Sequence, residues 1–119
     1  MKYLKKRKAA FKYAGIGIYK LFREEAHAKI HLLAAVCVIA CGIIFHISAT
    51  EWCLVSLCIG GVFMAEAFNT AVEKLADKVS REKDPLIATA KDVAAGAVLL
   101  MAATSVAVGL IIFLPKFIH

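Results

Sequence analysis

Uncharged apolar runs recur three times along the chain, and their lengths indicate the class of protein. Val93–Leu114 contains 22 residues without a charge, which is long enough for a helix to cross about 30 Å of hydrocarbon. Leu32–Phe45 and Trp52–Ala65 each contain 14, so both reach spanning length only with flanking polar residues included. Hydrophobic residues make up 61% of the 119, against roughly 45–50% in soluble domains. The pattern predicts an all-α membrane protein with transmembrane helices at about 30–48, 52–76 and 85–114.

The segment before the first apolar run, residues 1–29, is basic and amphipathic. Phe11, Ile18 and Leu21 follow nearly helical spacing, and lysines occupy much of the remaining surface. This pattern predicts a helix that lies in the membrane interface, with its basic side toward anionic lipid headgroups. We expect residues 1–119 to form one integral-membrane domain, because no repeat or linker suggests a second.

The uneven distribution of basic residues predicts the topology. Nine of the 15 Lys and Arg precede Ile30, five lie from Lys74 to Lys91, and the link HISATEW between the first two spans has none. By the positive-inside rule, the N-terminus and the 74–91 segment are cytoplasmic. The net charge of +6 then indicates contact with lipid headgroups or phosphates. Nucleic acid is not expected as a partner, because the basic residues lack the interleaved aromatic side chains that favour single-strand binding.

Two local patterns near the predicted membrane surface have structural interpretations. Asp84 followed by Pro85 is typical of an N-cap and the first position of a helix, so the third span is expected to begin there. His27 and His31 share a helix face, but a metal site normally needs a further ligand at hand. We interpret both histidines as interfacial or hydrogen-bonded side chains.

A polar segment with the sequence EAFNTAVEKLAD, residues 66–77, continues the second apolar run without a break in helical character. At about 100° per residue, its polar side chains share one stripe about 80° wide. This polar stripe consists of Glu66, Asn69, Glu73 and Asp77. An intramembrane carboxylate is costly unless it is paired, protonated or bound to metal. Groups expected at the same depth are Glu25, Lys29, Lys91 and Asp92.

Three interpretations of the polar stripe remain open at this point. It could belong to an enzyme that binds Mg²⁺ and an anionic substrate, since carboxylate oxygens and lysines suit phosphoryl chemistry. It could form an ion or proton pathway, in which intramembrane acids relay charge. It could be structural and pair with Lys29 and Lys91 to hold the helices together.

The same segment resembles the signature E-x-x-N-[ST]-A-[IV]-E-x-x-x-D of the prokaryotic diacylglycerol kinase family. The resemblance covers nearly the whole chain and includes A-K-D-V-A-A-G-A-V-L before the third span. It implies a homotrimeric enzyme of the bacterial inner membrane, with each site built from neighbouring protomers. Such an enzyme would transfer the γ-phosphate of ATP to a membrane lipid alcohol at the cytoplasmic face, with Mg²⁺ and without a conventional nucleotide loop.

The resemblance also implies roles for the polar stripe. Glu66 matches the catalytic base that takes the proton from the lipid hydroxyl, and Asn69 would orient groups beside it. Glu73 matches a metal ligand, and Glu25 matches a second acid that helps hold Mg²⁺. Asp77 is not assigned: a metal, a nucleotide contact and a salt bridge near Lys78 all remain open.

Further residues match the ATP-contacting positions of the family. Lys91 would steady the transferring phosphates, Asp92 would contact the nucleoside, and Tyr13 matches an aromatic residue of the surface helix. A functional arginine of the family falls by spacing on Lys6, next to Arg7, so either could take that role. The loop expected to contact the nucleotide contains Glu82, Lys83 and Asp84.

The acceptor lipid has two alternatives, undecaprenol and diacylglycerol. F-K-Y-A-G-I-G-I and R-E-E-A-H-A-K-I-H-L are more similar to the undecaprenol branch of the family. Here E-E-A-H stands where that branch usually has E-E-R-N. Both lipids carry one primary hydroxyl on long apolar tails, so the residues themselves leave the alternatives open.

Overall fold

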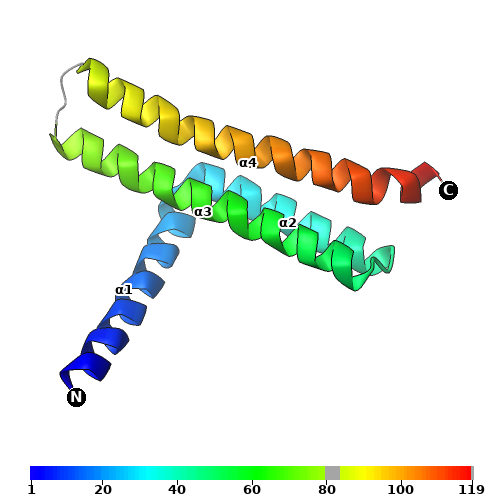
Figure 1. Ribbon diagram of the computed structural model, residues 1–119, viewed down its shortest axis with the longest axis horizontal. Coiled ribbons are helices and arrows are strands. Elements are labelled where there is room, and N and C mark those ends of the chain that lie inside the picture. Colours follow the sequence, from blue (N-terminus) through cyan, green and yellow to red (C-terminus); the bar gives the residue numbers. More distant parts are fainter. Residues whose placement is uncertain (80–83, 119) are drawn as a thin grey trace.

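The computed structural model describes residues 1–79 and 84–118, and this part of the chain is almost entirely helical. Its helices are α1 (Lys2–Glu24), α2 (Ala26–Ile44), α3 (Ala49–Val79) and α4 (Pro85–Ile118). Figure 1 shows α2, α3 and α4 running alongside one another, while α1 projects away from them. No strand occurs among the described residues, which confirms the predicted all-α class.

The surface helix is shorter than the predicted 1–29, because the helical conformation is interrupted at Glu25. This residue has an extended conformation, with φ −100° and ψ 119°, and α2 begins directly after it. Phe22 packs edge-on against Phe63 of α3, with ring centroids 5.0 Å apart. Only the C-terminal end of α1 is held in this way, and its other side chains are mostly exposed.

The turn between α2 and α3 is defined by backbone hydrogen bonds at both helix ends. His46 has φ 53°, and the N–H of Ile47 donates to the carbonyl of Gly42 at 3.2 Å, as in a Schellman motif. At the start of α3, Ser48 and Glu51 form a reciprocal capping box at 2.9 and 3.2 Å. Helix α2 therefore ends before the predicted residue 48, and α3 begins before the predicted residue 52.

The predicted start of α4 is confirmed. The Asp84 carboxylate accepts the N–H groups of Leu86 and Ile87 at 2.8 and 3.4 Å, and Pro85 occupies the first helical position. Proline is favoured there because its missing N–H would have no helical partner. Asp84 thus has a structural role that is independent of any ligand.

The end of α4 differs from the prediction of residue 114, because the helix continues through Pro115. Proline removes one helical hydrogen bond, and tertiary contacts hold the turn that follows. Phe117 packs edge-on against Phe45 of α2 with ring centroids 4.8 Å apart, and Lys116 Nζ lies 3.3 Å from Glu51. These contacts join the far end of α4 to the α2–α3 turn.

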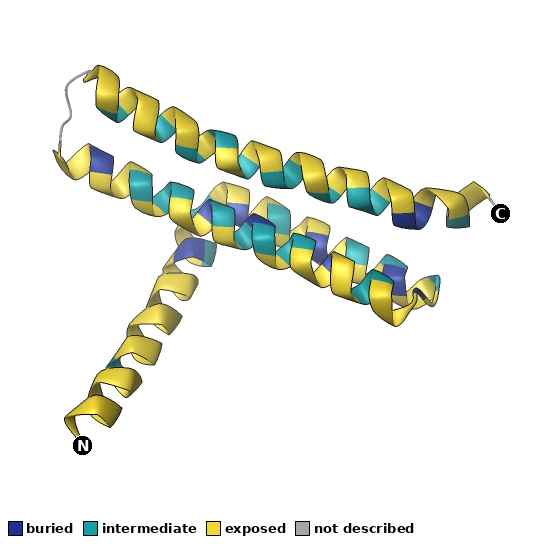
Figure 2. Cartoon of the chain, viewed as in Figure 1, coloured by how far each residue is buried: buried dark blue, intermediate teal, exposed yellow. Residues whose placement is uncertain are grey.

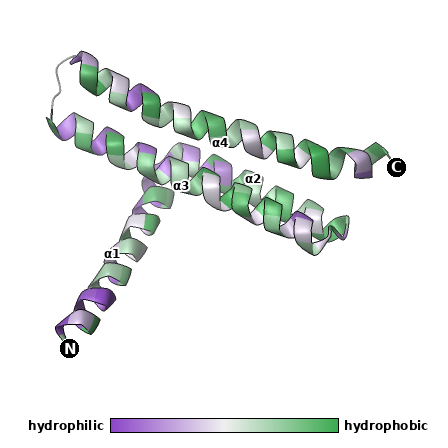
Figure 3. Cartoon of the chain, in the orientation of Figure 1, coloured by the Kyte–Doolittle hydropathy of each residue, from purple (hydrophilic) through white to green (hydrophobic). Residues whose placement is uncertain are grey.

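Most apolar side chains of the bundle face outward. Leu99, Leu100 and Ile111 are each more than 70% exposed, and Figures 2 and 3 show exposed and hydrophobic surface coinciding along α4. So large an apolar exterior marks a membrane or protein interface. Among the described residues α2, α3 and α4 are each long and apolar enough to span a bilayer, as predicted.

The buried core lies at the end of the bundle near the α2–α3 turn. Ile47, Val55, Ile112 and Phe113 form its centre, and side chains of all three bundle helices pack around them. Because α3 runs away from this turn, its polar C-terminal half lies toward the opposite end. The bundle is therefore closed by apolar packing at one end and carries its polar groups toward the other.

Close packing at Gly42 provides a stability prediction. A Cβ atom at this position would lie 2.6 and 2.9 Å from ring atoms of Trp52, and the rigid indole cannot move aside cheaply. Gly42→Ala is expected to destabilise the protein by about 1–3 kcal/mol, as overpacking typically does. Thermal unfolding in detergent measures this, with Gly60→Ala as the matched control because a Cβ there meets nothing within 4 Å. Equal losses in the two variants would contradict the prediction.

Candidate active site

Glu66 is the most deeply buried charged residue that the structure describes. It lies in the middle of α3 and retains only 4% of its surface exposed. Its Oε1 atom lies 3.2 Å from Nε2 of His31, which is on α2. The polar stripe therefore begins with a carboxylate enclosed between two membrane helices.

Asn69 follows Glu66 by one turn of α3, and its side chain is also partly enclosed. The Oδ1 atom is buried and has no hydrogen-bond partner among the described residues. A buried polar atom without a partner is costly, so this acceptor is suited to a donor that binds from outside the chain. A hydroxyl group or a bound water would supply such a donor.

Asp77 and Lys91 form the second polar cluster of the site. The Lys91 Nζ atom lies 2.6 Å from Asp77 Oδ1 and joins α4 to the C-terminal end of α3, a contact of the kind that the structural interpretation of the polar stripe expects. The side chains are 37% and 65% exposed, so this pair is accessible, unlike Glu66. Of the alternatives left open for Asp77, the structure places it in an ion pair, with Lys91 rather than near Lys78.

The predicted metal ligands are not part of a larger cluster in one chain. Glu73 is exposed on α3, and Glu25, the extended residue between α1 and α2, is half-buried. Among the described residues, no group of three or more His, Cys, Asp or Glu side chains converges as a metal site. A metal at these two carboxylates would need further ligands from outside the chain.

The remaining predicted ATP contacts are dispersed. Asp92 is exposed on α4, and Lys6 and Tyr13 are exposed on α1, whose N-terminal half lies far from α4 in Figure 1. The Arg7 guanidinium donates to the Tyr3 hydroxyl at 2.7 Å, so Arg7 and Lys6 have different surroundings. Glu82 and Lys83 lie outside the described residues.

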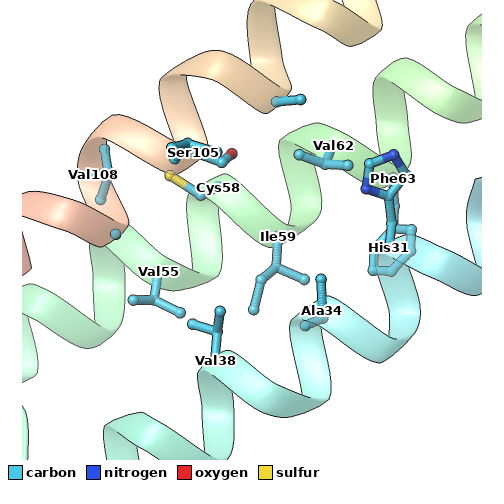
Figure 4. Close-up of a pocket in the computed structure, with 14 residues that line it drawn as sticks. His31, Ala34, Val38, Val55, Cys58, Ile59, Val62, Phe63, Ser105 and Val108 are labelled. Atoms are coloured by element: carbon cyan, nitrogen blue, oxygen red, sulfur yellow. The ribbon is translucent and has the colours of Figure 1, made fainter. Parts of the chain in front are cut away.

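An apolar groove with a volume of about 300 Å³ lies between α2, α3 and α4. Figure 4 shows Val38 and Ala34 of α2 facing Val55 and Ile59 of α3, with His31 at one end. The groove thus runs along the apolar parts of the three bundle helices and ends at His31, the histidine that contacts Glu66. A long apolar chain in this groove could place a terminal polar group beside Glu66.

A second hollow, of about 500 Å³, separates α1 from α3. Lys20 and Glu24 line it from α1, and Thr70 and Lys74 line it from α3. Lys74 Nζ lies 3.6 Å from the Glu24 carboxylate, which closes part of this hollow. Because Thr70 follows Asn69 directly, the hollow adjoins the polar stripe.

Sequence reasoning placed His31 near the interface but did not connect it with Glu66. The two residues are 35 positions apart, and no spacing rule relates their depth or their rotation about the two helices. The interpretation of His31 as a side chain with a polar partner is consistent with the contact at 3.2 Å. Two features of the sequence could have suggested the contact: the Glu66 carboxylate needs a polar partner, and His31 is a polar side chain near the start of the adjacent span.

Together these features define a small polytopic α-helical membrane protein with a buried carboxylate that contacts a histidine at the end of an apolar groove. Residues 12–113 match the model of the family described as prokaryotic diacylglycerol kinase. The chain belongs to this family, as its signature indicates, and it is a membrane lipid kinase.

Two curated relatives support this assignment. The undecaprenol kinase of Bacillus subtilis is 43% identical over 107 residues, which cover 90% of this chain and 87% of the relative. The diacylglycerol kinase of a Synechocystis strain is 34% identical over 110 residues, which cover 92% of this chain and 63% of that longer relative.

Proposed function

We propose that the chain transfers the γ-phosphate of ATP to the hydroxyl of a membrane lipid alcohol, at the cytoplasmic face of the bacterial inner membrane. The observation that carries this proposal is the buried Glu66 carboxylate in contact with His31, which lines one end of an apolar groove. A lipid chain in the groove would bring its hydroxyl to this carboxylate without leaving the bilayer. The polar stripe continues from there toward the basic, cytoplasmic side, where a soluble nucleotide is available.

In the proposed reaction, Glu66 accepts the proton of the lipid hydroxyl as the O–H bond breaks. The lipid oxygen forms a bond to the γ-phosphorus, and the bond between this phosphorus and the β–γ bridging oxygen breaks to release ADP. Asn69 would orient a bound water or another donor beside the reacting hydroxyl through its Oδ1, which has no hydrogen-bond partner among the described residues. Catalysis of this kind depends mainly on positioning and on neutralising the developing charge.

Magnesium fits the donor set of the proposed site. Glu25 and Glu73 offer carboxylate oxygens, and Mg²⁺ is commonly held by one or two carboxylates together with substrate phosphates and waters. Bound there, Mg²⁺ would neutralise charge on the phosphates of ATP. Two protein ligands are compatible with the lack of a three-ligand cluster in the described residues.

The nucleotide would be held by residues on several helices. We propose that Lys91 contacts the transferring phosphates. Its ammonium group would then either leave the Asp77 carboxylate or contact the carboxylate and the phosphates together. Asp92 would contact the nucleoside, with Asp84, Glu82 and Lys83 nearby in sequence. Lys6 or Arg7, and Tyr13, would contribute from α1.

We also propose a homotrimer in which neighbouring protomers complete each site. The exposed apolar faces of α2 to α4 and the distance of α1 from α4 support this arrangement, because the proposed ATP contacts on the described helices of one chain are not gathered at one place. The basic α1 would rest on anionic lipid headgroups with the N-terminus in the cytoplasm.

Undecaprenol is the proposed acceptor, with diacylglycerol as the alternative. The undecaprenol kinase relative shares more identity and a larger part of its length with this chain. The test is transfer of labelled γ-phosphate from ATP into chloroform-extractable product by purified protein in detergent, with both lipids assayed in parallel. We expect product in both assays, a higher kcat/KM with undecaprenol, and loss of product when EDTA removes divalent metal. No labelled lipid from either acceptor would contradict the proposed function.

A further inference from the structure

We propose that His31 is a positioning residue for the reaction, through its contact with Glu66. The His31 Nε2–H would donate to Glu66 Oε1 and hold the carboxylate so that Oε2 faces the lipid hydroxyl. This inference rests on the proposed function, in which Glu66 is the catalytic base. His31 itself touches neither reacting atom in this scheme, so its effect is exerted through the carboxylate.

The burial of Glu66 makes such a partner necessary. A carboxylate with 4% exposure at the hydrocarbon boundary loses its hydration, and a nearby donor must replace it. Among the basic side chains of the described residues, His31 is the one that contacts Glu66, with its Nε2 atom 3.2 Å from Oε1. Lys91 pairs with Asp77 and Lys74 with Glu24, whereas Lys29, also expected at this depth, is exposed on α2.

Orientation matters because the terminal torsion of a glutamate side chain is broad. Without a hydrogen bond the carboxylate plane samples many angles, so neither oxygen is held in a defined direction. Donation to Oε1 removes this freedom and also selects the tautomer of His31 that carries its proton on Nε2. The other oxygen is then left for the substrate.

The position of His31 relates this function to the apolar groove. The imidazole stands at the end of the groove, beside Phe63 and Val62 in Figure 4. A lipid chain lying in the groove would therefore pass His31 before its hydroxyl reaches Glu66. The same ring thus orients the base and borders the path of the substrate.

The test compares His31→Gln with His31→Leu. Glutamine can still donate an N–H toward Oε1, whereas leucine keeps comparable bulk without a donor. We expect His31→Leu to lower kcat by about 10- to 100-fold, the loss typical when a residue that orients a metal ligand through a hydrogen bond is removed. His31→Gln should stay within about threefold of the parent, and the KM for ATP should change less than twofold in both. His27→Leu is the matched control, an exposed histidine one turn earlier on α2 that should behave as the parent.

Equal losses in His31→Leu and His31→Gln, or parental kcat in His31→Leu, would overturn the inference. Glu66→Gln, assayed alongside, separates the two hypotheses. If this variant is inactive while His31→Leu is fully active, the role of Glu66 as the base stands and the positioning role of His31 fails.

A second measurement does not depend on turnover. In ¹⁵N NMR of histidine-labelled protein in detergent, His31 should be protonated on Nε2, and this resonance should shift in Glu66→Gln. An Nδ1-protonated His31 that is insensitive to Glu66→Gln would also overturn the inference.

Discussion

Glu66→Gln is expected to lower kcat for lipid phosphorylation by about 10²- to 10⁴-fold, the range typical of losing a general base. The amide has nearly the shape of the carboxylate and can still accept from His31, but it cannot take the proton of the lipid hydroxyl. The KM for ATP should change little, because this residue does not contact the nucleotide in the proposed mechanism. Initial rates with saturating lipid and varied ATP measure both quantities.

The same substitution at Glu51 is a matched control for this prediction. Glu51 lies in the first turn of α3, where it caps the helix and pairs with Lys116 at 3.3 Å. Glu51→Gln should lower the unfolding temperature slightly and leave kcat near the parental value. Circular dichroism and the elution volume of both variants show whether fold and oligomer are intact. Parental turnover by Glu66→Gln would remove this residue as the base.

Lys91→Met is expected to lower kcat/KM for ATP by about 10²- to 10³-fold, as the loss of a charge that stabilises the transferring phosphates would. Methionine keeps much of the length and apolar stem of lysine while removing the ammonium group. The effect should fall mainly on ATP, with the KM for the lipid nearly unchanged. Steady-state rates with each substrate varied in turn measure this division.

Asp77→Asn tests whether Lys91 acts on the substrate or only on α3. Both variants break the ion pair at 2.6 Å, but only Lys91→Met removes the ammonium group. An exposed pair contributes about 0.2–1 kcal/mol, so both should unfold at similar temperatures. If the role is purely structural, the two variants should lose activity equally, which would contradict the prediction. Lys74→Met, which removes another paired lysine, is expected to remain close to the parent in activity.

Much of the fold could be predicted from local sequence because its determinants are local. The length of an uncharged run decides whether a helix can span the bilayer, and the start of α4 followed from Asp84 and Pro85. Helix ends that depend on distant contacts were less predictable. The continuation of α4 through Pro115 depends on Phe45 and Glu51, which are more than sixty residues away in the chain.

The candidate site shows the same division between local and tertiary determinants. Helical spacing alone placed the polar stripe on one face of α3, and the family signature within it indicated the chemistry. The sequence by itself thus determined the class of protein, the stripe and the location of the polar groups at one end of a membrane helix. These properties follow from periodicity and hydropathy, which act within a single helix.

Only the tertiary structure decided what each member of the stripe meets. Glu66 is enclosed against His31 of α2, whereas Asp77 reaches Lys91 of α4 and remains exposed. The reason is that α3 extends beyond the start of α2, so its two halves have different neighbours (Figure 1). The relative depth and rotation of packed helices depend on side chains far apart in the chain, and no periodicity within one helix specifies them.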